Sequence, residues 1–122
     1  MKVEISNGDL VDKYVILEIK LKRIKGSEAL QKIREEHAIL KPLVESLKIK
    51  ESLIVDLKFI NSIMWDVEDR IRDKERIKEF DEDFIELARS VYSNNDRRFR
   101  IKRQINQETS SFIEEQKSYD NI

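Results

Sequence analysis

The residues that could do chemistry lie mainly in the middle of the chain. Four side chains there are spaced four, three and four residues apart, so on a helix they share one face: Asn61, Trp65, Glu68 and Arg72. An indole beside an amide, a carboxylate and a guanidinium suits a ring or a sugar that stacks on Trp65 and is held by hydrogen bonds. The alternative is structural: Trp65 packs at the edge of a helical bundle, and Glu68 and Arg72 form an exposed i,i+4 ion pair.

A second polar cluster lies further along the chain and comprises Arg89, Tyr92, Asn95 and Asp96. We expect a tight break in the helix over residues 93–96, where free backbone amides followed by arginines would form an anion site. The alternative is that Asn95 or Asp96 only caps the next helix, and that Arg89 pairs with a carboxylate on a neighbour.

Together the two clusters predict a binding site and no catalytic residue. Trp65 would stack on the ligand, and Arg72 and Arg89 would hold its anionic groups. Asn61 and Glu68 would orient the ligand, which we expect to be a partner protein or a small anionic molecule, with no cofactor. An equally simple hypothesis makes the same residues a structural network that locks two helices together.

Pairs of carboxylates raise a metal site as an alternative. Asp66 with Asp69, and Asp83 with Glu86, are each three residues apart, on helices that could pack antiparallel. Two such pairs could hold Mg²⁺ against the phosphates of a nucleotide, as in all-α nucleotide phosphohydrolases. Acidic residues number 25 of 122, so such pairs are also expected by chance. The E-E-x-x-E and E-x-x-D motifs of those enzymes are missing.

A basic run over residues 97–103 (RRFRIKR) offers an RNA-binding alternative, with Phe99 placed to stack on a base. A run of this length is more often a solvated helix face. The formal net charge of −1 gives no overall attraction to nucleic acid or to anionic lipid. Nucleic acid is therefore not the expected partner.

Composition excludes several classes of protein. The chain has no cysteine, so it has no disulfide framework and no thiolate site. Its single histidine, His37, excludes mechanisms that need two imidazoles and lies on an apolar stripe, where we expect it at the edge of the core. We find no signal peptide and no apolar run of membrane-spanning length, and we expect a cytoplasmic protein without a membrane partner.

The pattern of apolar residues predicts the helices that position these clusters. Two glycines and one proline are too few turn-forming residues for a multi-stranded β fold. We expect Ser6 to cap a first helix, Pro42 to kink or break a second, and Asp81 to cap a later one. We therefore expect residues 1–122 to form a single all-α domain, an antiparallel bundle of four to five helices with short loops.

Two further features concern the surface and the end of the chain. Several apolar stripes are narrow and heptad-like, and a chain of this length has a limited core, which favours a homo-oligomer. Residues 110–122 have weaker periodicity and are expected to form a loosely packed tail, in which Phe112 and Tyr119 are the candidates for packing.

Three blocks of the chain carry longer motifs. Residues 4–13 (EISNGDLVDK) continue into 16–20 (ILEIK), residues 60–72 read INSIMWDVEDRIR, and residues 84–98 read FIELARSVYSNNDRR. They resemble a family of small uncharacterised bacterial proteins, a domain of unknown function, with the signatures N-x-x-L-W-x-I-E-D-x-I-R and F-I-x-L-A-R-x-V-Y-x-x-N-D-x-R. Met64 stands where the family usually has leucine, and residues 36–52 match loosely. The resemblance implies no assigned activity, places the polar clusters within the signatures, and implies an accessory role in surface-polysaccharide synthesis.

Overall fold

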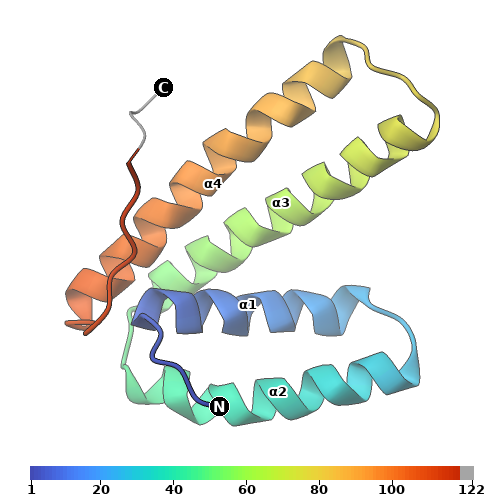
Figure 1. Cartoon of the computed structure of the whole chain (residues 1–122). Coiled ribbons are helices and arrows are strands. Elements are labelled where there is room, and N and C mark those ends of the chain that lie inside the picture. The colour runs from blue at the N-terminus through green and yellow to red at the C-terminus, as the bar shows by residue number, and fades with distance from the viewer. Residues whose placement is uncertain (119–122) are drawn as a thin grey trace.

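The computed structural model describes residues 1–118, and Tyr119 lies outside the described residues. That range contains four helices and no strand: α1 (Asn7–Arg23), α2 (Ser27–Ser46), α3 (Glu51–Arg76) and α4 (Glu82–Glu108). They form two antiparallel hairpins, α1–α2 and α3–α4. Helix α1 lies across the half of the α3–α4 hairpin that contains the start of α3 and the end of α4 (Figure 1). The predicted all-α bundle is confirmed, with four helices and short loops.

Helix α1 is the centre of the fold, because it packs against each of the other three helices. Ser6 caps it as predicted, with its hydroxyl accepting a hydrogen bond from the Asp9 amide at 3.0 Å. Val11 and Val15 are fully buried, and they form the core with Val44, Leu53, Leu57 and Ile105. The core therefore draws at least one residue from every helix.

At Pro42 we expect a kink or a break, and the break is wrong, because α2 continues through the proline to Ser46. Proline removes the hydrogen bond that its nitrogen would donate to the carbonyl of Ala38. Ala38 and Pro42 are both exposed, so water can satisfy the freed carbonyl. The loop that separates α2 from α3, over residues 47–50, lies where the chain length indicates a turn.

The expected break at residues 93–96 is also wrong, and no new helix begins there. Helix α4 runs without interruption from its cap at Asp81, which is confirmed, to Glu108. The polar side chains of this segment bond along the same helix: Asn94 accepts from Arg97 at 3.5 Å and Asn95 accepts from Arg98 at 3.4 Å. Because both oxygens accept hydrogen bonds from arginines three residues later in the same helix, they do not cap the start of a new helix.

After α4 the chain turns back and runs beside that helix (Figure 1). The Asn7 amide donates to the Ser111 hydroxyl at 3.0 Å, and Lys102 pairs with Glu115 at 3.4 Å. The ammonium of Lys117 lies 5.0 Å from the centre of the Phe99 ring. Phe112 is 91% exposed, so the expectation that it packs is wrong. Polar contacts hold this tail.

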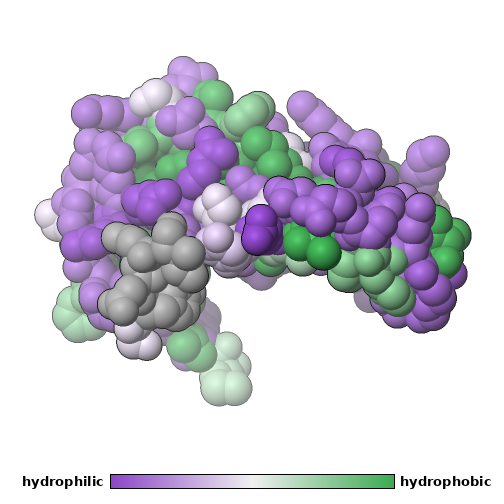
Figure 2. Space-filling model, turned by 90° about the horizontal axis from the view of Figure 1, so that it is seen from above, coloured by the Kyte–Doolittle hydropathy of each residue, from purple (hydrophilic) through white to green (hydrophobic). Residues whose placement is uncertain are grey.

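Hydrophilic residues cover most of the face seen from above, and hydrophobic residues reach that surface in separate patches (Figure 2). Large apolar side chains are exposed on several elements, among them Ile39, Leu43, Val55, Phe59, Ile77 and Phe80. Within residues 1–118 none of the helices combines the length and the apolar character that crossing a membrane requires.

Candidate functional site

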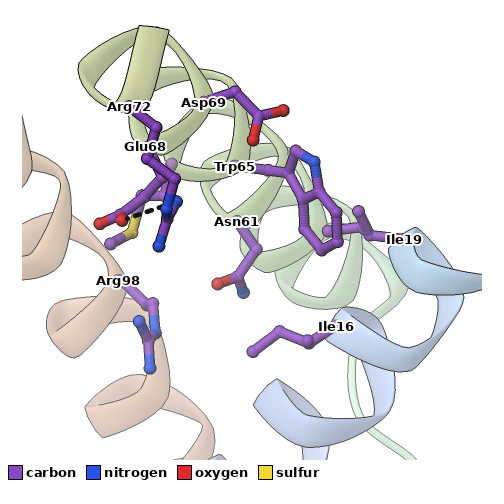
Figure 3. A pocket seen from close by; sticks show the side chains of 9 residues that line it. Ile16, Ile19, Asn61, Trp65, Glu68, Asp69, Arg72 and Arg98 are labelled. Carbon is purple, nitrogen blue, oxygen red and sulfur yellow. Dashed lines mark ion pairs between the residues drawn. The ribbon is translucent and has the colours of Figure 1, made fainter. Parts of the chain in front are cut away.

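A cavity of about 400 Å³ opens where α1 crosses α3 and α4. Its apolar lining comes from Ile16, Ile19 and Met64, and its other side chains are Asn61, Trp65, Glu68, Asp69, Arg72 and Arg98 (Figure 3). All four residues of the first predicted cluster therefore line one cavity. A size of this order is typical of sites for small ligands.

Two residues of the lining, Asn61 and Arg98, share one buried carboxylate. Asp12 on α1 has a side chain only 8% exposed and accepts from Asn61 Nδ2 at 2.8 Å and from Arg98 at 3.0 Å. The same Asn61 nitrogen donates to the Leu57 carbonyl at 3.0 Å. One carboxylate thus ties α1, α3 and α4 together beside the cavity lining, and it holds the Arg98 side chain in one orientation.

Two guanidinium groups, from Arg72 and Arg98, face this cavity from different helices (Figure 3). Arg72 pairs with Glu68 at 3.3 Å, and both side chains are substantially exposed. The predicted i,i+4 ion pair is therefore present, and it stands at the mouth of the cavity. Exposed pairs of this kind contribute only about 0.2–1 kcal/mol. A ligand could take the place of Glu68 at little cost.

The indole of Trp65 extends from α3 toward Ile19 of α1 (Figure 3). The guanidinium carbon of Arg23 lies 5.7 Å from the indole ring centre, within cation–π range. Arg23 also hydrogen-bonds Asp66 at 2.5 Å, which raises the pKa of Arg23 and lowers the pKa of Asp66. These contacts from α1 hold the aromatic ring at the side of the cavity.

The second predicted cluster lies outside this cavity. Arg89 pairs at 3.2 Å with Glu86 on its own helix and not with a carboxylate on a neighbouring element. Tyr92 is 44% exposed, and Asp96 is half-buried. Only Asn95 reaches the site, through its hydrogen bond from Arg98. The structure therefore does not bring the two predicted clusters into one site.

The sequence analysis did not assign Asp12, Ile16 or Ile19 to a site, and it placed Arg98 in the anion site expected at the second cluster and not with Trp65. Arg98 stood in the basic run, and nothing in its spacing separated it from its neighbours. Asp12 carried one usable signal, since it is a carboxylate between the buried Val11 and Val15 positions of an amphipathic helix. Buried carboxylates require a partner, and such a position points to an ion pair with another helix.

The four carboxylates of the magnesium alternative do not gather. Among residues 1–118 no three histidine, aspartate or glutamate side chains are grouped closely enough to hold a metal ion. Asp66 is bonded to Arg23 and Glu86 to Arg89, while Asp69 lines the cavity.

The basic run is divided among different faces of α4. Lys102 is buried and pairs with Asp9 at 2.8 Å, Arg98 faces the cavity, and Ile101 packs against the core. Arg97, Arg100 and Arg103 remain exposed. Only part of the run is therefore available to a polyanion.

These features define a small all-α protein with a mixed polar and aromatic cavity at the crossing of two helical hairpins. The chain matches the family of unknown function DUF6165 over residues 1–122, and it belongs to that family. The searches of curated proteins and of solved structures gave no match.

Proposed function

We propose that this protein binds a small anionic molecule that contains a ring, in the cavity between α1, α3 and α4, and performs no chemistry of its own. The observation that carries this proposal is the convergence of Arg72, Arg98 and Trp65 on one cavity (Figure 3). Guanidinium groups bind carboxylate and phosphate through paired hydrogen bonds, and an indole offers a flat surface for stacking.

The buried network supports a preorganised site. Because Asp12 and Asn95 both accept from Arg98, that guanidinium does not need to be ordered by the ligand. Both protons of Asn61 Nδ2 are used by Asp12 and by the Leu57 carbonyl. The carbonyl oxygen of the Asn61 side chain then remains to accept a hydrogen bond from the ligand.

Fluorescence provides a direct test, because Trp65 is the only tryptophan in the chain. We would titrate the protein with AMP and galacturonate, and with their uncharged counterparts adenosine and galactose. We expect saturable changes with the anionic compounds and at least about tenfold weaker binding of the uncharged ones, a difference of about 1.4 kcal/mol. No response to any of the four compounds would contradict the proposal.

Arg72→Gln and Arg89→Gln form a matched pair of variants. Each arginine is exposed and each pairs with a glutamate on its own helix, but only Arg72 lines the cavity. Arg72→Gln should weaken binding about tenfold or more, and Arg89→Gln should leave it unchanged. If Arg72→Gln only destabilises the fold and leaves ligand binding intact, the polar residues are a structural lock between helices.

We also propose that the protein self-associates and resides in the cytoplasm. Exposed apolar residues on α2 and α3 support self-association: Ile39, Leu43, Val55 and Phe59. Light scattering after size-exclusion chromatography should give a mass above the 14.6 kDa of one chain. A mass of one chain at every concentration would contradict the self-association.

An accessory role in surface-polysaccharide synthesis, which the family resemblance implies, remains a prediction. The magnesium-dependent phosphohydrolase and the RNA-binding alternatives have less support, since the carboxylates do not cluster within residues 1–118 and the basic run is partly buried.

A further inference from the structure

A second cavity, of about 320 Å³, lies beside the first on the other side of Ile16. Ile16 lines both cavities, and Asp12 in the second is bonded to Arg98 in the first at 3.0 Å. Its charged side chains come from α1 and α2 and include Lys13, Lys20 and Glu36. Nothing in the sequence pattern marked this second cavity.

We propose that the ligand continues from the first cavity across Ile16 into the second, and that it is an acidic oligosaccharide of at least two sugar units. This inference rests on the proposed function of the first cavity and specifies its ligand. The shared Ile16 side chain and the Asp12–Arg98 pair make the two cavities neighbouring parts of one surface on α1.

The charges of the lining favour a sugar acid over a nucleotide. In the first cavity Arg72 pairs with Glu68 and Arg98 pairs with Asp12, while Asp69 adds a further carboxylate. In the second cavity Lys13 pairs with Glu36, and Asp9 pairs with Lys102 of α4. Closely spaced phosphates would meet these carboxylates and be repelled. A chain with one carboxylate per sugar fits the basic groups, and its hydroxyls can donate to the carboxylates and to Asn61.

The secondary structure of the lining favours a sugar over a peptide. Both cavities are lined by residues of helices, and the Asp9 amide, in the first turn of α1, is bonded to the Ser6 hydroxyl. The backbone amides and carbonyls of a helix interior are bonded within the helix. An extended peptide bound there would find no sheet edge with which to pair its backbone. A sugar chain has no such backbone, and a pyranose ring can stack on Trp65.

Lys20 is the residue through which the second cavity can be tested. It lines that cavity, it is half-buried, and among residues 1–118 it has no ion-pair partner. Lys22 is an exposed lysine on the same helix that lies outside both cavities. The two lysines therefore provide a test variant, Lys20→Gln, and a control, Lys22→Gln, with the same change of charge.

The experiment titrates Trp65 fluorescence with galacturonate, digalacturonate and trigalacturonate, and with maltotriose and AMP for comparison. We expect digalacturonate to bind at least about tenfold more tightly than galacturonate. Lys20→Gln should remove most of this gain, Lys22→Gln should keep it, and maltotriose should bind more weakly than trigalacturonate.

Equal affinities for one, two and three galacturonate units would overturn the inference while leaving the first cavity as a site for a single anionic ring. Tighter binding of AMP than of every galacturonate would overturn it in favour of a nucleotide. If no compound changes the fluorescence, the proposed function itself fails. Retention of the gain in Lys20→Gln would show that the added units do not enter the second cavity.

Discussion

Arg98 on α4 donates to Asp12 on α1 across 3.0 Å, although 86 residues separate them along the chain. Asp12 is almost fully buried and also accepts from Asn61 on α3. The contact therefore joins three helices and holds two residues of the candidate site, Asn61 and Arg98. A substitution there is expected to change stability as well as binding.

Asp12→Ala should lower the free energy of unfolding by about 2–4 kcal/mol, because it leaves Arg98 and Asn61 without the partner that offsets their desolvation. Urea denaturation measures this difference. Glu86→Ala is the control, since it breaks the exposed pair with Arg89 and should change stability by less than about 0.5 kcal/mol. Equal effects of the two variants would contradict the role given to Asp12.

Leu57→Ala should lower the free energy of unfolding by about 2–5 kcal/mol, because Leu57 is fully buried where α3 contacts the core. Val55→Ala on the same helix is the comparison, since Val55 is 56% exposed and its removal leaves no cavity. Thermal and chemical denaturation should agree for both variants. A loss of stability for Leu57→Ala as small as that for Val55→Ala would contradict the place of Leu57 in the core.

Gly8→Ala tests the close approach of α1 to α4. An added Cβ would lie 2.6 Å from the Lys102 carbonyl oxygen and 3.0 Å from Asn106 Oδ1. Helix propensity alone predicts a gain of about 1 kcal/mol for alanine inside a helix. We expect a clear loss of stability instead, because a backbone carbonyl of α4 would have to move. A higher melting temperature would show that the two helices are further apart than described.

Acid should weaken the contact between Asp9 and Lys102. Burial alone would raise the pKa of Asp9, but the Lys102 ammonium at 2.8 Å and the Ser6 hydroxyl lower it below its ordinary value of 3.8. This stabilisation is present above the unfolded-state pKa and is lost as the pH falls through the folded-state value. Asp9→Asn should therefore show less loss of melting temperature on acidification than the wild type. Asp56→Asn, at an exposed position on α3, should follow the wild type.

The local signals of the sequence predicted much of this fold. Ser6 and Asp81 cap helices as expected, because an N-cap depends on residues within one turn. Residues 93–96 were misread, since a run of polar residues has the same composition in a turn and in a continuous helix. The structure shows a continuous helix there, in which Asn94 and Asn95 bond to the following arginines and α4 packs on α3.

The candidate site was predicted only where it lies on one helix. Asn61, Trp65, Glu68 and Arg72 share a cavity, as their spacing on α3 indicated. Arg98 and Asp12 reach it through the crossing of the two hairpins, and helical spacing carries no information about that crossing. For the same reason the spacing could not show that Arg89, which like Arg72 pairs with a glutamate on its own helix, lies outside the cavity.

The contacts of α1 with the far end of α4 have a consequence for how the protein is made. The Gly8 amide bonds Asn106 at 2.6 Å over a sequence separation of 98 residues. The ribosome therefore synthesises the first helix long before α4, so Val11 and Val15 lack their contact with Ile105 until α4 has been made. The core is therefore completed only after α4 has been synthesised, and nascent chains stalled before α4 should be digested by protease more readily than chains that include it.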